Sequence, residues 1–248
     1  MTDVVVLAAG LGRRLAGVAQ VPKWLIPVNG SCPADAHLQA FVAAEVDRVH
    51  VVVSPDSASI ARHVAPWEDR LELELVPNPH AADRNNWYSL LLGLDAWRAG
   101  PGRDVVVVNS DLFARGEWFT ALLREITSTG LPAALAVDRA RGRTEEAMKV
   151  ELDSAGDAVG AIGKVGIERP EGEYVGLAWW ERAAAEELRA VLAAFEDQPD
   201  RVDNWYEHGI QQHLDAGARY AAADVPSSDW VEIDDERDLE AARRLPGG

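Results

Sequence analysis

The chain begins with an apolar run that leads directly into a glycine-rich turn. Residues 4–17 read VVVLAAGLGRRLAG, and the segment PKWLIPVNG follows at 22–30. An almost unbroken apolar run is typical of a strand that is buried on both faces, as in a parallel sheet. Glycines in the turn permit positive φ angles and allow backbone N–H groups to face an anion. This opening therefore predicts a central strand with a ligand-binding loop at its carboxyl end.

Strand-like and helix-like segments alternate along the rest of the chain. Strands are expected at 3–8, 48–54, 71–76, 104–109, 131–137 and 173–179. Helices are expected at 85–100, 117–130, 181–197 and 235–245. This alternation predicts an α/β fold with an open, mostly parallel, Rossmann-like sheet flanked by helices. The alternating LELELV at 71–76 indicates a strand with one wet face or a position near the sheet edge.

Residues 146–180 have a different pattern. The composition of SAGD at 154–157 is that of a tight turn, and it predicts a small β-hairpin extension that folds over the ligand site. No internal repeat, low-complexity tract or long linker divides the sequence. We therefore expect a single domain over 1–248.

Composition limits the partners and the compartment. The formal net charge of −17 argues against nonspecific nucleic-acid binding, which needs a basic surface. No apolar segment approaches the roughly 20 residues of a membrane span, and the start of the sequence lacks a signal-peptide pattern. Cys32 is the one cysteine and has no partner for an internal disulfide, so a cytoplasmic protein is expected. An acidic protein that binds a polyanion needs a local basic pocket or a metal cation.

Positive charge gathers in the turn after the first strand, where Arg13, Arg14 and Lys23 lie near Gly10 and Gly12. Taken alone, this pattern also fits an ordinary glycine turn with solvated arginines. It is not a dinucleotide fingerprint, which needs a third glycine three residues after the second. It is not a P-loop either, because no G-K-S/T follows.

The run LAAGLGRRL followed by PK resembles the signature L-A-A-G-x-G-x-R and P-K of the sugar-phosphate nucleotidylyltransferase superfamily. The matching residues are Leu7, Ala8, Ala9, Gly10, Gly12, Arg14, Pro22 and Lys23. The resemblance implies the nucleotidyltransferase form of the sheet, with the loop, including Arg13, around an NTP triphosphate. It also implies that Arg14 and Lys23 bind phosphates. Members of the superfamily transfer NMP to a phosphate-bearing acceptor and release pyrophosphate.

Two aspartates match metal-binding positions of the superfamily, which implies Mg²⁺ as the cofactor. Asp111 follows the buried run VVVVN, and Asp234 lies in IDDERDL, which resembles the late I-D-x-x-x-D-L segment of the superfamily. Taken alone, Asp111 also fits a turn aspartate and Asp234 a helix N-cap. Asp235 is the alternative N-cap, which would leave Asp234 free.

The segment NNWYSL at 85–90 resembles the phosphocholine and phosphonate cytidylyltransferase branch more than the sugar-nucleotide branch. That branch implies CTP as the donor, with Asn86 and Ser89 near its base. MKV, IGK and GEYVGLAWW further along the chain also resemble it. Lys149 and Lys164 lie in the first two of these segments and are expected to reach the acceptor or the α-phosphate. Lys149 also fits a solvated strand lysine.

The acceptor is expected between the hairpin and residues 203–208. There Trp205 and Tyr206 offer an aromatic wall beside Glu207, and Trp179 is a further candidate. Aromatic rings hold quaternary ammonium groups through cation–π attraction, which suits phosphocholine. Most tryptophans fill a protein core instead, and a small phosphonate such as 2-hydroxyethyl- or 2-aminoethylphosphonate needs fewer rings. Both kinds of acceptor stay open.

The expected chemistry is an in-line attack of the acceptor oxygen on the α-phosphorus of CTP. That oxygen is already anionic near neutral pH, so the protein supplies positioning and charge neutralisation rather than a general base. Two alternatives stay open: a sugar-1-phosphate nucleotidylyltransferase that uses another NTP, and a noncatalytic nucleotide-binding regulatory protein. The second should have lost the basic loop or a metal aspartate, whereas this chain keeps both. The sequence specifies no oligomeric state.

Overall fold

The structure is a computed structural model that describes residues 2–10, 12–15, 17–18, 20–141 and 144–246, apart from the side chain of Arg13. The strands are β1 (Thr2–Ala8), β2 (Arg48–Val53), β3 (Glu72–Pro77), β4 (Asp104–Asn109), β5 (Leu112–Ala114), β6 (Ala133–Asp138), β7 (Lys149–Leu152), β8 (Val159–Gly163), β9 (Gly172–Trp180), β10 (Tyr220–Asp224) and β11 (Trp230–Glu232). The α-helices are α1 (Pro33–Ala43), α2 (Ala58–Val64), α3 (Asn86–Arg98), α4 (Trp118–Ile126), α5 (Arg182–Ala193), α6 (Tyr206–Asp215) and α7 (Glu236–Arg244).

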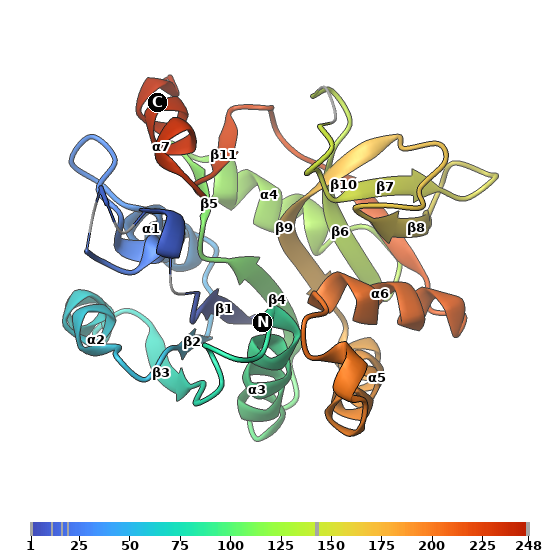
Figure 1. Cartoon of the computed structure of the whole chain (residues 1–248), viewed down its shortest axis with the longest axis horizontal. Coiled ribbons are helices and arrows are strands. Elements are labelled where there is room, and N and C mark those ends of the chain that lie inside the picture. Colours follow the sequence, from blue (N-terminus) through green and yellow to red (C-terminus); the bar gives the residue numbers. More distant parts are fainter. Residues whose placement is uncertain (1, 11, 16, 19, 142–143, 247–248) are drawn as a thin grey trace.

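A large twisted sheet runs through the molecule in the order β10-β6-β9-β4-β1-β2-β3 (Figure 1). Neighbours along this path are parallel, except that β9 lies antiparallel between β4 and β6. The prediction of an open, mostly parallel sheet flanked by helices is confirmed. The alternating segment LELELV lies in β3, the edge strand, as its pattern indicated.

Separate sets of helices cover the two faces of the sheet. Helices α1, α2 and α4 pack on one face, and α3, α5 and α6 pack on the other (Figure 1). Strand β1 shows why its sequence is continuously apolar: Val4 and Val6 enter the first core, whereas Val5 and Leu7 enter the second. Each such side chain stabilises the fold by about 1.5–3 kcal/mol when it is fully buried. Both faces of a central strand therefore require apolar residues.

Two small additions shape the carboxyl edge of the sheet. Strands β7 and β8 form the expected hairpin, whose turn contains Gly156 at a φ angle of +77°, and β7 also pairs with β9. Strands β5 and β11 are far apart in the sequence but form a separate antiparallel pair. Just beyond that pair, the N–H of Ile233 donates to the carbonyl of Asp111 at 2.9 Å. This pairing brings Asp111 and Asp234 to the same end of the small sheet.

Some boundaries differ from the expected ones. The strand expected at 131–137 begins at Ala133, directly after Pro132, which has no N–H to donate to a neighbouring strand. The helix expected at 181–197 is α-helical only to Ala193 and then tightens into a short 3₁₀ turn. Such tightening is common in the last turn of a helix.

Several described elements were not expected: α1, α2, α6, β5, β10 and β11. Strand β10 reads YAAAD, and alanine favours helices, but parallel pairing with β6 makes it a strand. Helix α6 contains Gly209, which weakens a helical pattern. A Cβ at Gly209 would lie 2.6 Å from the Leu192 Cδ2, so glycine is what allows α6 to pack against α5.

Among the described helices, none combines the length and apolar character that crossing a membrane demands.

Candidate active site

The neighbouring parallel strands β1 and β4 end at the same edge of the sheet. Leu7 pairs with Asn109 near that edge, so the chain leaves the two strands at adjacent points. The glycine-rich loop and the loop that carries Asp111 therefore start side by side. In open α/β sheets, ligands bind beyond the carboxyl ends of the strands.

Two glycines give the first loop its shape. Gly12 has a φ angle of +55°, and a Cβ there would lie 3.3 Å from the Lys23 Cγ. A Cβ at Gly10 would meet no atom within 4 Å. The loop thus packs closely on Lys23 at one glycine and borders open space at the other. The side chain of Arg13, a predicted nucleotide-binding residue, lies outside the described part of the chain.

Lys23 joins the first loop to the two predicted metal aspartates. Its Nζ lies 3.1 Å from the Asp111 Oδ2 and forms a second ion pair with the Asp234 Oδ1. The other oxygen of Asp234, Oδ2, accepts a hydrogen bond from the Arg14 guanidinium at 2.7 Å. Four charged residues from three distant segments therefore meet at one point.

Mutual neutralisation keeps this group charged. Burial opposes the charge on Lys23, but Asp111 and Asp234 outweigh it, and the pKa of Lys23 is raised. Burial likewise opposes the charge on Asp234, but Lys23 and Arg14 outweigh it, and the pKa of Asp234 is lowered. An opposite charge within a few ångströms stabilises the charged form in both cases.

The adjacent aspartates at the start of α7 do different things. Asp235 is the N-cap, and its Oδ1 accepts hydrogen bonds from the N–H groups of Arg237 at 2.8 Å and Asp238 at 3.1 Å. Asp234 instead turns its carboxylate towards the lysine and arginine of the first loop. The helix cap therefore does not compete for the oxygens of Asp234.

A cavity of about 180 Å³ opens beside the charged group. Its lining includes Lys23 and the predicted nucleotide-binding residues Leu7, Ala9, Gly10, Asn86, Ser89 and Asp111. The Ser89 Oγ accepts a hydrogen bond from Asn78 at 2.9 Å, and a hydroxyl that accepts one bond can still donate another to a ligand. Ala8 points away into the core on the opposite face of the sheet.

A second cavity, of about 440 Å³, adjoins the first. The two share Asn109 and Asp111. The lining of the second comes from the hairpin region, β11, the start of α7 and the segment around Trp205. Two cavities that meet at a carboxylate suit a reaction between two bound substrates.

A family model for the MobA-like NTP transferase domain matches residues 4–216. The chain belongs to this family. The matched residues include the glycine-rich loop, Lys23, Asp111 and the hairpin, so the family covers most of both cavities. Most of the lining of both cavities therefore lies in a nucleotidyltransferase domain.

Comparison with individual proteins gives cytidylyltransferases as homologues. A 2-aminoethylphosphonate cytidylyltransferase from Lancefieldella rimae is 30% identical over 118 residues, which make up 45% of this chain and 46% of that protein. The alignment thus spans about half the length of the curated relative. The inositol-1-phosphate CTP transferase from T. maritima superposes with a TM-score of 0.78 at 21% identity, over 99% of this chain and 96% of that chain. The CTP:phosphocholine cytidylyltransferase from Streptococcus pneumoniae gives a TM-score of 0.78 at 17% identity, over 98% of both chains. At such identities the two structures show the fold alone.

Lys164, Trp205 and Glu207, which were all predicted near the acceptor, line the second cavity of this nucleotidyltransferase. The Lys164 Nζ is 4.7 Å from the centre of the Trp205 ring and 3.4 Å from a carboxylate oxygen of Glu146. The Trp205 ring also stacks on His208, with the ring centres 5.6 Å apart. The protein itself therefore already supplies a cation to this tryptophan.

Three other residues that were predicted near the acceptor lie outside the described lining of both cavities. Tyr206 is buried, and its hydroxyl donates to the Asn109 Oδ1 at 3.2 Å, so it supports a residue that both cavities share. Trp179 is 4% exposed and packs in the core. Lys149 donates to backbone carbonyls, including that of Lys164 at 2.8 Å, and so braces the hairpin.

Carboxylates dominate the lining of the second cavity. The acidic residues are Asp111, Glu146, Glu173, Glu207, Glu232, Asp234, Asp235 and Asp238, and the basic residues are Arg14, Arg141 and Lys164. Burial raises the pKa of Glu207 to about 7, and its Oε2 has no hydrogen-bond partner among the described residues. Burial and then the nearby Asp111 and Asp234 raise the pKa of Glu232. A cationic ligand would relieve this concentration of negative charge.

A buried histidine links the segment that carries Lys23 to the segment that carries Asp111. His37 on α1 accepts a hydrogen bond from the Trp24 indole at 3.1 Å and donates one to the Leu112 carbonyl at 2.8 Å. Burial lowers the pKa of His37 to about 4, so the ring is neutral near pH 7 and can make both bonds. Trp24 follows Lys23 and Leu112 follows Asp111, so His37 fixes the spacing of that ion pair.

Sequence reasoning missed several residues of the site: His37, Asn78, Asn109, Arg141, Glu173 and Glu232. Three of them have a weak sequence signal that has a physical basis. Asn109 ends the buried run VVVVN, and Asn78 directly follows β3, so both occupy the carboxyl edge of the sheet. Glu232 stands two residues before Asp234. A polar residue at the carboxyl end of a strand is the pattern that would have found these three.

Cys32 is not an activated nucleophile. Burial raises the pKa of its thiol to about 12, so the thiol is protonated near neutral pH. Reactive cysteines have lowered pKa values and electropositive surroundings, whereas the Cys32 thiol here donates a hydrogen bond to the Asp35 carboxylate at 3.2 Å.

Proposed function

We propose that this chain is a cytidylyltransferase that transfers CMP from CTP to a small phosphonate or phosphate with a cationic group, and that 2-aminoethylphosphonate is its acceptor. The observation that carries the proposal is the pair of cavities that share Asn109 and Asp111. One lies beside the glycine-rich loop, and the other is lined by carboxylates. The partial alignment with a 2-aminoethylphosphonate cytidylyltransferase supports the same acceptor class.

The donor occupies the smaller cavity in this proposal. Its phosphates lie against the open backbone at Gly10, with Arg14 and Lys23 as their cationic partners. Its base lies near Asn86 and Ser89, where the hydroxyl oriented by Asn78 donates a hydrogen bond. CTP follows from the resemblance of this segment to cytidylyltransferases and from the relatives, since hydroxyl and amide groups also suit other bases.

Asp111 and Asp234 fit a magnesium ion. Both carboxylates already converge on one cation, the Lys23 ammonium. The Asp111 Oδ1 is buried and has no hydrogen-bond partner among the described residues. Oxygen atoms of carboxylates and phosphates are the ligands that Mg²⁺ prefers. When bound there, Mg²⁺ would neutralise part of the charge on the phosphates of donor and acceptor.

The acceptor occupies the larger cavity. Lys164 already lies over the Trp205 ring, so that ring is engaged by the protein rather than open as a cage for a quaternary ammonium. Glu207 and Glu232 instead offer carboxylates, which hydrogen-bond to a primary ammonium. Arg141 and Lys164 supply the opposite charge for a phosphonate. This distribution suits a small zwitterion.

The reaction is a single displacement. An acceptor oxygen forms a bond to the α-phosphorus while the bond from that phosphorus to the bridging oxygen breaks, and pyrophosphate leaves. The attacking oxygen is already anionic, so no proton has to be removed. Lys23 and Arg14 hold the leaving phosphates, and the shared edge at Asn109 keeps the substrates adjacent. Catalysis therefore rests on positioning and charge neutralisation.

Pyrophosphate release from a panel of nucleotides and acceptors tests this proposal. CTP, UTP, GTP, ATP and dTTP are each combined with 2-aminoethylphosphonate, 2-hydroxyethylphosphonate, phosphocholine, inositol-1-phosphate and glucose-1-phosphate in the presence of Mg²⁺. We expect the highest kcat/KM for CTP with 2-aminoethylphosphonate. The uncharged-tail analogue 2-hydroxyethylphosphonate is the matched control for the ammonium group.

Other results would contradict particular parts of the proposal. Turnover of 2-hydroxyethylphosphonate equal to that of 2-aminoethylphosphonate would contradict the proposed binding of the ammonium group by Glu207 and Glu232. Preference for phosphocholine would show that a quaternary ammonium displaces Lys164 from Trp205. Efficient use of glucose-1-phosphate without the small acceptors would place the chain among sugar nucleotidylyltransferases. CTP binding without pyrophosphate release from any acceptor would favour a regulatory role.

A further inference from the structure

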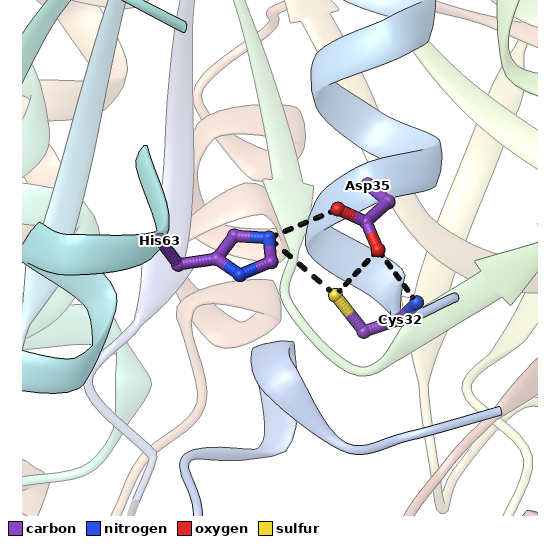
Figure 2. A group of neighbouring side chains, drawn as sticks. All are labelled: Cys32, Asp35 and His63. Carbon is purple, nitrogen blue, oxygen red and sulfur yellow. Dashed lines mark hydrogen bonds and ion pairs between the residues drawn. The ribbon is translucent and has the colours of Figure 1, made fainter. Parts of the chain in front are cut away.

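A second group of metal-ligating side chains lies apart from the substrate cavities. Cys32, Asp35 and His63 direct one ligand atom each into a common space, and these atoms lie within 4.8 Å of one another (Figure 2). Cys32 and Asp35 belong to the start of α1, and His63 comes from α2. Within the described lining of the two substrate cavities, none of the three occurs.

The three side chains lie close enough together to share one ion. The His63 Nε2 lies 3.0 Å from the Asp35 Oδ1 and 3.7 Å from the Cys32 Sγ, and that sulfur lies 3.2 Å from the Asp35 Oδ2. A tetrahedral zinc ion with bonds of about 2.3 Å to sulfur and about 2.0 Å to nitrogen and oxygen separates those atoms by roughly 3.3–3.6 Å. The contacts of this group differ from these separations by only a few tenths of an ångström. The histidine and the cysteine contact different oxygens of Asp35, so a rotation of that carboxylate would bring one oxygen towards both.

The same geometry argues against a catalytic proton relay. In a relay, a histidine uses one ring nitrogen towards the nucleophile and the other towards the carboxylate. Here the Cys32 thiol and the Asp35 carboxylate both approach the Nε2 of His63, as Figure 2 shows. One nitrogen has either one proton or one lone pair. Convergence on a single nitrogen therefore suits a shared cation.

We propose that Cys32, Asp35 and His63 bind Zn²⁺ and thereby tie the start of α1 to α2. Sulfur and imidazole donors select such an ion over Mg²⁺, which prefers oxygen ligands. Three protein ligands leave a fourth position for water. On binding, the proton of the Cys32 thiol passes to solvent and a sulfur–zinc bond forms.

Two further observations fit an ion at this place. The side chains of Asp35 and His63 are 28% and 29% exposed, so an ion can enter from solvent. The Cys32 N–H donates to the Asp35 Oδ2 at 3.0 Å, and such bonds orient a ligating carboxylate. Helix α1 also carries His37, so the ion would restrain the helix that spaces the catalytic loops. The proposal stands independently of the acceptor and of nucleotidyl transfer.

Cobalt binding to the full chain tests the site, because a cysteine thiolate gives Co²⁺ a ligand-to-metal charge-transfer band. The titration is done in excess Mg²⁺, which occupies oxygen-only sites. We expect one thiolate-bound Co²⁺ per chain and its displacement by Zn²⁺. Cys32→Ser should abolish the band, and both Cys32→Ser and His63→Gln should weaken Zn²⁺ binding on the order of 100-fold. Zn²⁺ should also raise the melting temperature of the unsubstituted protein but not that of Cys32→Ser.

His80→Gln is the matched control, because His80 pairs with Asp83 at 3.1 Å without a cysteine and its loss should leave the cobalt spectrum unchanged. The melting temperature without metal shows whether each variant folds. If Cys32→Ser does not fold, His63→Gln gives the same test from a more exposed position. Cobalt binding without a thiolate band, or unchanged Zn²⁺ affinity in a folded Cys32→Ser or His63→Gln variant, would overturn the proposal.

Discussion

The two substrate cavities are built in different ways. The smaller one is lined by the ends of β1 and β4, the glycine-rich loop and the start of α3, and its charged residues are Lys23, Arg84 and Asp111. The larger one combines the hairpin, β11 and the start of α6, and carboxylates dominate its lining. The smaller cavity, proposed for the donor, is thus built from loops at the carboxyl ends of core strands and from α3, whereas the larger one, proposed for the acceptor, depends on how the hairpin, β11 and α6 meet. Substitutions on the two sides should therefore have separable effects.

The largest effect should come from Lys23, where the two sides meet. Lys23→Ala removes the cation that both Asp111 and Asp234 contact, and with it a donor to the leaving phosphates. Loss of one such donor costs roughly 10²- to 10³-fold in turnover. Steady-state pyrophosphate release measures this, with circular dichroism as the control for folding. Turnover equal to that of the unsubstituted protein would remove the basic loop from the mechanism.

The adjacent aspartates of α7 allow a sharper comparison. Asp234→Asn should lower turnover about 100-fold or more, because it removes a carboxylate that would hold the Mg²⁺ between the donor and acceptor phosphates. Asp235→Ala should leave turnover near normal but lower the free energy of unfolding by about 1 kcal/mol, since it removes the N-cap. Kinetics and urea denaturation of both variants check this. The reverse pattern would assign the catalytic role to Asp235.

Michaelis constants should separate the two cavities. Ser89→Ala removes one neutral hydrogen bond and should raise the KM for CTP roughly 3- to 10-fold without changing that for the acceptor. Glu207→Gln removes a carboxylate and should raise the KM for 2-aminoethylphosphonate by about 10-fold or more at about pH 8, without changing that for CTP. Bisubstrate kinetics measure both constants. A rise in the same constant for both variants would contradict the division into donor and acceptor sides.

The smallest effect concerns stability and pH. Burial raises the pKa of Glu207 from 4.5 to about 7, so the folded state keeps a proton that the unfolded state releases between those values. This contribution to stability is complete below about pH 4.5 and is lost as pH rises through about 7. The glutamine in Glu207→Gln is neutral at every pH. The melting temperature of this variant minus that of the unsubstituted protein should therefore be larger at about pH 8 than at about pH 5.

The exposed Glu68 provides a matched control for that measurement. Glu68→Gln should give the same difference in melting temperature at both pH values. The raised pKa of Glu207 would be contradicted if its variant behaved in the same way as the Glu68 variant.

The sequence predicted the elements whose local pattern matches their final environment. The buried runs in β1 and β4 and the alternating β3 lie where their patterns indicated. The reason is that the order of apolar and polar residues directly reflects whether one face or both faces of a strand are buried. The sequence did not predict β10, an alanine-rich segment whose partner β6 lies far away in the sequence. Pairing with a distant strand leaves little trace in a short window of residues.

Gly10, Arg14 and Lys23 were predicted from the sequence because a phosphate-binding loop needs glycine and basic residues, and Asp111 and Asp234 because they match metal-binding positions of the superfamily that the chain resembles. Their meeting at one point, the acidic second cavity and the bracing by His37 were decided by the tertiary structure. Strand pairing between β5 and β11 and hairpin attachment to β9 bring these groups together. The burial that raises the pKa of Glu207 likewise arises only after distant segments exclude water, which no local pattern records.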